Sequence, residues 1–354
     1  MTNPTSNGLE GVVVADTAIS EVDGERGHLV IAGADVERLA VATTFEQAVT
    51  SVLVAGGARI SAPALGAARA AAWELVPRLG DALALPEAMD ALRTALGHVR
   101  PTGDDLVDAI AAIGAAPVFV AAWGRTRAGA APIAPDPALS HAADYLRMST
   151  GASPTPDATK ALDAYLVTVI DHGMSASTFT ARVITSTGSD LISAMVGGVG
   201  ALKGPLHGGA PGPVLDMLDA IGTPANAEPW ILAELAAGRR IMGMGHRIYR
   251  VRDPRAAVLE TAVRPLASRR LEMARAVETA ASKILRERKP DRPLAANVEF
   301  YTAVLLDAVG LPREQFSATF AVSRIAGWSA HVIEQRRTGR LIRPASRYVG
   351  ATPA

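Results

Sequence analysis

Two histidines lie in glycine-rich stretches of the sequence. His207 lies in KGPLHGGAPGP (203–213), and His246 lies in MGMGHRIYRVRDPRA (242–256). Glycine lets the backbone approach a ligand closely and adopt positive φ angles, so histidines in such loops suit ligand binding better than core packing. The second stretch also carries four arginines, namely Arg247, Arg250, Arg252 and Arg255. The combination indicates a site for a small polyanion, and the alternative for either loop alone is an exposed connection.

Other kinds of site lack their characteristic residues. Gly198-Val199-Gly200 lacks the third glycine of a dinucleotide fingerprint, and the sequence has no Gly-Lys-Ser/Thr phosphate loop. The two loop histidines have no helical i, i+4 partner and no carboxylate at metal-ligand spacing, so no metal site is expected. No serine stands in a nucleophile elbow. The absence of cysteine excludes thiolate chemistry and a disulfide framework.

The length of the chain is sufficient for two domains, and its composition carries no strong overall charge. The chain has 354 residues, and its 35 lysines and arginines balance 35 acidic residues. No overall field would therefore attract nucleic acid or an anionic membrane. The start, MTNPTSNGLEG, lacks the pattern of a secretory signal, and no apolar run reaches about 18 residues. We expect a cytoplasmic protein that binds neither nucleic acid nor membrane.

A small hairpin and a series of helices must position the candidate residues. The apolar runs Val12–Val14 and Leu29–Ile31 flank Asp23-Gly24, which predicts a β-hairpin over residues 10–33 and the only sheet. From Asp35 onward, apolar residues at helical spacing predict helices.

The helices after the hairpin have recognisable starts and faces. One helix should begin after the possible caps Thr43 and Thr44. Residues 161–203 predict two long helices, the first leading to Asp171-His172. The second is rich in Ser, Ala, Thr and Gly, and such small side chains permit close packing at a buried or subunit interface.

The last predicted helix carries polar residues on one face. SRIAGWSAHVIEQRR (323–337) places Arg324, Trp328, His331 and Gln335 on the same side. Trp328 and His331 are predicted to be core residues. The arginines that follow would read as a solvated basic tail, and they are Arg336, Arg337, Arg340, Arg343 and Arg347.

Taken together, the two glycine loops resemble the signatures of the citrate synthase family. They appear here as Gly204-Pro205-Leu206-His207-Gly208-Gly209, as Gly243-Met244-Gly245-His246-Arg247 and as Asp253-Pro254-Arg255. The resemblance extends from residues 8–27 to residues 340–350. It implies a mainly α, two-domain helical fold with a small N-terminal β-hairpin. Residues 1–212 would form the first part of a large helical domain, 213–314 a small mobile domain, and 315–354 the return to the large domain.

The resemblance also implies a reaction. A citrate synthase-type acyltransferase condenses acetyl-CoA with oxaloacetate and hydrolyses the citryl-CoA intermediate to citrate and CoA, a step of the tricarboxylic acid cycle. Acetyl-CoA is then a co-substrate, and no cofactor is bound permanently. Two alternatives stay open. One is a 2-methylcitrate synthase that uses propionyl-CoA, and the other is a non-catalytic paralogue that keeps the fold for binding or regulation.

The family roles map onto named residues of this sequence. His207 would hydrogen-bond the thioester oxygen, His246 would polarise the ketone of oxaloacetate, and Glu299 would be the base. The resemblance assigns oxaloacetate binding to His172, Arg255, Arg324 and Arg343, the last reaching the site of a second subunit in a homodimer. It places coenzyme A along Gly204, Leu206, Gly208, Gly243 and Gly245, with its phosphates near Arg250.

The sequence departs from the family pattern at two of these places. Gly173 stands where the family usually has glutamate after the histidine of an Asp-His-Glu motif. Glu299 stands where the family has its catalytic aspartate, which makes the side chain one methylene longer. These two changes together motivate the non-catalytic alternative.

Overall fold

The computed structural model describes residues 7–9, 11–208, 211–246, 248–288 and 294–351. Gly209 of the first histidine loop and Arg247 of the second lie outside the described residues. The fold is mainly α-helical, as predicted, with one three-stranded sheet in the described part of the chain.

The sheet confirms the predicted turn and corrects its first strand. β1 (Ser20–Asp23), β2 (His28–Ile31) and β3 (Ala34–Asp35) pair antiparallel in that order. Asp23 stabilises the turn, because its Oδ1 accepts hydrogen bonds from the backbone N–H groups of Glu25 and Arg26. The expectation that Val12–Val14 forms a strand is wrong. The strand that pairs with β2 begins only at Ser20, which lies opposite Ile31.

Seven α-helices follow the sheet in the first half of the described chain. They are α1 (Val36–Ala42), α2 (Phe45–Ala55), α3 (Leu65–Trp73), α4 (Ala88–Leu96), α5 (Asp105–Arg127), α6 (His141–Thr150) and α7 (Pro156–Thr168). As predicted, α2 starts at Thr44, which forms a capping box with Gln47. By length and composition α5 could span a membrane, but 78% of its apolar window is buried inside the protein. It is a central core helix.

The segment 161–203 contains more helices than predicted. After α7 come α8 (Ala176–Ser186) and α9 (Leu191–Leu202). The break falls at Gly188, which has a φ of 87°. Asp190 then caps α9 by accepting the backbone N–H of Ser193. The single second helix that was expected is therefore two shorter helices, α8 and α9, which pack against each other.

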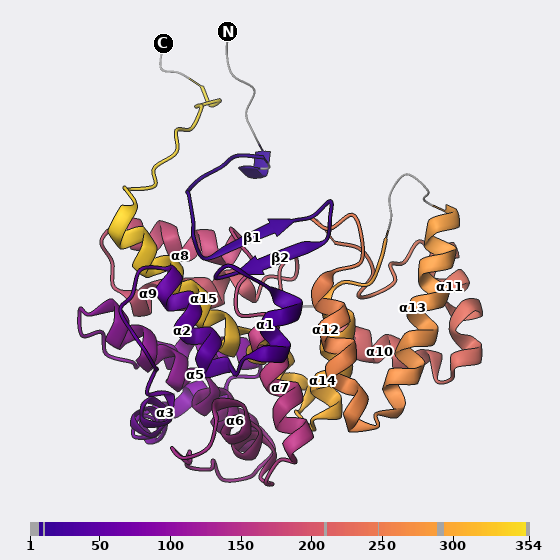
Figure 1. Cartoon of the computed structure of the whole chain (residues 1–354), viewed down its shortest axis with the longest axis horizontal. Helices are drawn as coiled ribbons and strands as arrows, with labels where there is room; N and C mark the ends of the chain where they lie inside the picture. The colour runs from indigo at the N-terminus through magenta and orange to yellow at the C-terminus, as the bar shows by residue number, and fades with distance from the viewer. Residues whose placement is uncertain (1–6, 10, 209–210, 247, 289–293, 352–354) are drawn as a thin grey trace.

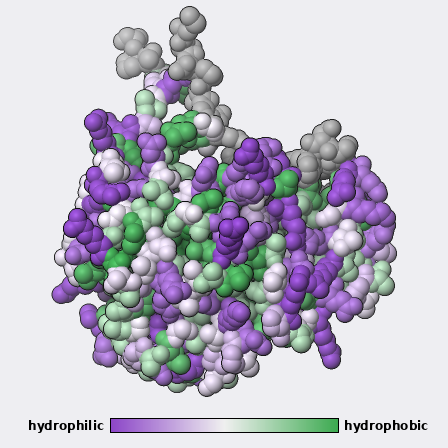
Figure 2. Space-filling view, viewed as in Figure 1, coloured by the Kyte–Doolittle hydropathy of each residue, from purple (hydrophilic) through white to green (hydrophobic). Residues whose placement is uncertain are grey.

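Six further α-helices follow in the described part of the chain. They are α10 (Pro211–Ile221), α11 (Ala227–Ala236), α12 (Pro254–Val263), α13 (Arg269–Arg288), α14 (Val298–Ala308) and α15 (Phe316–Thr338). Short 3-10 turns span Asn7–Leu9, Val76–Arg78, Gly80–Ala84, Pro224–Asn226, Arg264–Leu266 and Arg313–Gln315. Figure 1 shows α10 to α13 on one side of the molecule and α15 on the other, with the β1–β2 hairpin lying across the top between them. Mostly hydrophilic residues cover the α11 and α13 side (Figure 2).

Backbone pairing brings the second histidine loop beside the start of α14. Met244 forms an isolated antiparallel bridge with Ala296. The N–H of Gly245 donates to the carbonyl of Ala295 at 2.7 Å, and the N–H of Asn297 donates to the carbonyl of Gly243 at 2.9 Å. Residues 243–246 are therefore fixed relative to Glu299, although the two lie far apart in sequence.

Candidate active site

Six of the predicted residues come together from six different segments. His172 lies between α7 and α8, His207 follows α9, and His246 precedes α12. The other three lie on helices and are Arg255 on α12, Glu299 on α14 and Arg324 on α15. Their charges act on one another: Arg255, Arg324, His246 and His207 all lower the pKa of His172, after burial as the largest cause. The predicted cluster is therefore assembled in one place.

The loop around His246 fixes the tautomer of its imidazole. Its Nδ1 accepts the backbone N–H groups of Ile248 and Tyr249, at 3.0 and 3.1 Å. Because an N–H can only donate, the proton of the neutral ring sits on Nε2. Burial lowers the pKa of His246 to about 4, aided by the nearby Arg255 and opposed by Asp253. His246 is thus neutral at pH 7 and has an Nε2–H that a ligand oxygen can accept.

His207 is held in the opposite tautomer. Its Nε2 lies 2.8 Å from Ser177 Oγ and 3.3 Å from the backbone N of Ser177. Trp328 Nε1–H donates to the same Oγ at 3.2 Å. Because the backbone N–H of Ser177 can only donate, Nε2 of His207 acts as an acceptor. The proton of neutral His207 then sits on Nδ1. Burial lowers the pKa of His207, and Arg324 lowers it further.

Trp328 confirms its predicted place in the core and also contacts the site. Its side chain is fully buried and packs against Gly198, where an added Cβ would lie 2.9 Å from the indole ring. Through Ser177 it orients His207. Sequence spacing placed Trp328 beside Arg324, but only the folded chain links it to a histidine of another segment.

His172 joins the cluster through Tyr249. Its Nε2 lies 3.0 Å from Tyr249 Oη, and its ring centroid lies 5.7 Å from that of His246. The sequence analysis missed Tyr249, whose only signal is its position three residues after His246.

Arg324 is a buried cation with an uncommitted hydrogen-bond donor. Its side chain is 1% exposed, and its Nε donates to the carbonyl of Val169 at 2.8 Å. Its Nη2 is buried and has no hydrogen-bond partner. Burial lowers the pKa of Arg324 to about 10, against the opposing charge of Asp171. Leaving a buried donor unpaired is costly, and a carboxylate is the natural partner for a guanidinium.

Asp253 positions both Arg255 and the start of α14. Its two oxygens accept Arg255 Nε at 3.0 Å and Nη2 at 2.7 Å. Oδ2 also accepts the backbone N–H of Val298 at 3.1 Å. This buried carboxylate therefore leaves Arg255 Nη1 free of Asp253 and available to a ligand. It also connects Arg255 to the turn that carries Glu299.

Glu299 occupies the first turn of α14, where its environment suits a base. Asn297 accepts the backbone N–H of Glu299 at 3.0 Å and donates its own side-chain N–H to the carbonyl of Gly245 at 2.8 Å. The side chain is half-buried. Burial raises the pKa of Glu299 to about 7, although Arg255 acts in the opposite direction. A carboxyl with this pKa can accept and return a proton at neutral pH.

The predicted coenzyme A residues form a less enclosed surface. Leu206 is fully exposed, Gly204 is half-buried and Gly208 is buried. Gly243 and Gly245 have φ angles of 72° and 88°, which only glycine adopts easily. Arg250 is exposed, and its Nε lies 3.8 Å from Glu25 of the hairpin turn.

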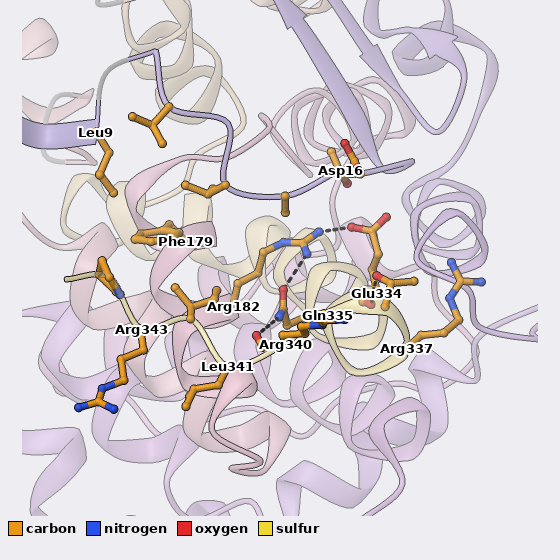
Figure 3. A pocket seen from close by; sticks show the side chains of 18 of the residues that line it. Leu9, Asp16, Phe179, Arg182, Glu334, Gln335, Arg337, Arg340, Leu341 and Arg343 are labelled. Carbon is orange, nitrogen blue, oxygen red and sulfur yellow. Dashed lines mark hydrogen bonds and ion pairs between the residues drawn. The ribbon is translucent and has the colours of Figure 1, made fainter. Parts of the chain in front are cut away.

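Arg343 lies apart from the cluster in its own chain. It follows α15 in an extended segment that borders a cavity of about 830 Å³. Figure 3 shows this cavity, with the guanidinium of Arg343 directed away from the ion pair between Arg182 and Glu334. The prediction that Arg343 serves a second subunit stays a prediction. Within the described residues, no group of three or more His, Asp or Glu side chains could hold a metal ion.

Comparisons with known proteins assign the family. The sequence model of the citrate synthase C-terminal domain matches residues 8–345. The chain is 40% identical to the putative citrate synthase 2 of Mycobacterium tuberculosis, covering 98% of this chain and 93% of that protein. It is 36% identical to the 2-methylcitrate synthase of the same organism, covering 99% and 93%. The citrate synthase of Thermoplasma acidophilum, solved in a ternary complex with carboxymethyl coenzyme A and oxaloacetate, matches with a TM-score of 0.88, 27% identity and coverage of 100% and 98%. The chain belongs to the citrate synthase family of condensing transferases.

Proposed function

We propose that the chain condenses acetyl-CoA with oxaloacetate and hydrolyses the resulting citryl-CoA to citrate and CoA. The observation that carries the proposal is the unpaired, buried Nη2 of Arg324, close to the neutral His207 and in the same cluster as the neutral His246. A dicarboxylate with a ketone offers a carboxylate to the arginine and a carbonyl oxygen to a histidine. Oxaloacetate has both groups.

Glu299 and His207 would activate the thioester. The Glu299 carboxylate takes a proton from the carbon next to the thioester carbonyl. The Nδ1–H of His207 donates a hydrogen bond to the thioester oxygen as enolate character develops. Such a preorganised donor typically contributes about 3 kcal/mol to transition-state stabilisation. Ser177 keeps this donor in place, because it occupies the other imidazole nitrogen.

His246 and the carboxylate-binding residues would prepare oxaloacetate for attack. The Nε2–H of His246 polarises the ketone, so that the enol carbon can attack it. Arg324, Arg255 and His172 hold the carboxylates, which supplies orientation and proximity. The neutral state of His246 suits this role, because a neutral imidazole donates one hydrogen bond without drawing a counter-charge into the site.

The coenzyme A, domain and subunit assignments extend the same proposal. Coenzyme A lies along the glycine loops near Gly204, Leu206, Gly208, Gly243 and Gly245, with Arg250 near its phosphates. Residues 213–314 act as a small domain that closes when oxaloacetate binds and excludes water. Two copies form a homodimer, in which the partner subunit's Arg343 completes each site. The half-exposed small residues of α8 and α9, including Thr180 and Gly197, support a subunit contact there.

The test is thiol release from acetyl-CoA and from propionyl-CoA, each with and without oxaloacetate. The chain has no cysteine, so the protein adds no thiol background. We expect release that depends on oxaloacetate and is faster with acetyl-CoA. Faster release with propionyl-CoA would instead indicate a 2-methylcitrate synthase, which would use the same groups. No release from either would favour the non-catalytic paralogue and overturn the proposal.

A further inference from the structure

The N-terminal hairpin contacts the loops of two site histidines at once. The hairpin is anchored to the hydrophobic core, because Leu29 and Ile31 of β2 are buried in it. Its first strand meets the segment around His172, and its turn meets the segment after His246. These two loops are far apart in the sequence, and Tyr249 already joins them through its contact with His172.

The first contact is a hydrogen-bonded triangle at the start of β1. Ser20 Oγ donates to Asp171 Oδ2. The backbone N–H of Gly173 donates to Ser20 Oγ at 2.9 Å and to Asp171 Oδ2 at 3.0 Å. The residues on both sides of His172 are therefore held against β1. Among the described residues, Ser20 is the only hairpin residue whose side chain hydrogen-bonds to this segment.

Gly173 is part of this contact. Its φ is 61°, and an added Cβ would lie 3.3 Å from Val22 Cγ2. A glutamate, the usual family residue here, would be strained at this φ and crowded by β1. The close approach of the hairpin therefore gives a physical reason for the departure at Gly173.

The second contact is a close backbone approach at the hairpin turn. The N–H of Arg250 donates to the carbonyl of Gly24 at 2.9 Å. An added Cβ on Gly24 would lie 2.4 Å from the carbonyl oxygen of Ile248, a separation that no backbone tolerates without moving. The segment that the turn contacts, Ile248 to Arg250, contains the two backbone N–H groups that fix the tautomer of His246.

We propose that the hairpin positions both histidine loops, with Ser20 acting on His172 and Gly24 acting on His246. The catalytic consequence rests on the roles proposed above for these histidines. Ser20 and Gly24 are positioning residues, since neither is among the groups assigned to contact a substrate. Loss of the Ser20 bond should loosen oxaloacetate binding, whereas displacement at Gly24 should slow the chemical step.

The test uses Ser20→Ala and Gly24→Ala, with Arg26→Ala as the matched control. The Arg26 side chain is 79% exposed in the same turn and forms an ion pair with Asp23 at 3.8 Å, and among the described residues it has no hydrogen bond or ion pair with either loop. Ser20→Ala should fold, because Asp171 keeps its contact with His331 at 3.2 Å. Ser20→Thr retains the hydroxyl and should behave as the parent chain.

Two measurements separate this proposal from the proposed function. Hydrogen–deuterium exchange should rise in peptides covering 171–175 for Ser20→Ala and in those covering 246–252 for Gly24→Ala, with neither rise in the control. In an active enzyme, the KM for oxaloacetate should rise about tenfold for Ser20→Ala, which is the loss expected for one buried polar contact. For Gly24→Ala, kcat should fall about tenfold, because the added Cβ would displace the backbone at Ile248 and with it His246.

The outcomes decide between the two. Exchange in both loops equal to that of the control overturns the positioning role, whether or not the enzyme is active. Looser loops with unchanged kinetics overturn it for catalysis. An inactive parent chain overturns the proposed function alone, and the exchange result still decides whether the hairpin orders the loops.

Discussion

The pH dependence of turnover should report the ionisation of Glu299. Burial raises its pKa to about 7, and a base must be deprotonated to act. Below pH 7 the active fraction falls about tenfold per pH unit, so kcat/KM at pH 6 should be about one tenth of its plateau value. His246, with a pKa of about 4, stays neutral over this range and adds no second limb. Initial rates of thiol release between about pH 5.5 and 8.5 measure the profile.

Glu299→Gln provides the matched variant. It keeps the size and hydrogen-bonding capacity of the side chain but cannot accept the proton, so the rate should fall by roughly 10²–10⁴ with little loss of oxaloacetate affinity. Glu299→Asp restores the usual family residue, and a rate below that of the parent chain would indicate a backbone adapted to glutamate. An acid limb well below pH 7, or a Gln variant as fast as the parent, would refute the assignment of Glu299 as the base.

Three further predictions follow from the geometry of the described residues. Arg324→Lys keeps the charge but loses the planar fork, so oxaloacetate should bind about 10- to 100-fold more weakly by calorimetry, and unchanged binding would exclude Arg324 as a ligand. Ser177→Ala removes the side-chain contact with His207 Nε2 and leaves only the longer backbone N–H contact, so kcat should fall about tenfold; equal kcat would mean that the serine hydroxyl does not position His207. Thr44→Ala removes a capping box, so the free energy of unfolding in urea should fall by about 1 kcal/mol, whereas an unchanged midpoint would show that the cap is dispensable.

Local sequence signals predicted the helices and the hairpin turn well. Thr44 and Gln47 form the capping box that the helix start required, and Asp23 closes the turn. Val12–Val14 does not form the predicted strand, because β-branched residues favour a strand only where a partner edge is available. The break at Gly188 was not predicted, although the polar run Thr185–Asp190 around it is itself a loop signal.

The site was predicted from motifs, and its supporting residues were not. The glycine loops led to His207 and His246, and the family resemblance led to His172, Arg255, Glu299 and Arg324. The contacts of Ser177 with His207, of Tyr249 with His172 and of Asp253 with Val298 span long sequence separations and depend on the tertiary arrangement of several helices. No periodicity or spacing in the sequence encodes such contacts, so they emerge only from the folded chain.

The most direct test of the central claim is to identify the product. Purified protein with acetyl-CoA and oxaloacetate should form citrate and CoA in equal amounts by mass spectrometry, and Glu299→Gln at the same concentration should form neither at a comparable rate. CoA released without citrate would indicate a simple thioester hydrolase, and the absence of both products from the parent chain would contradict the account.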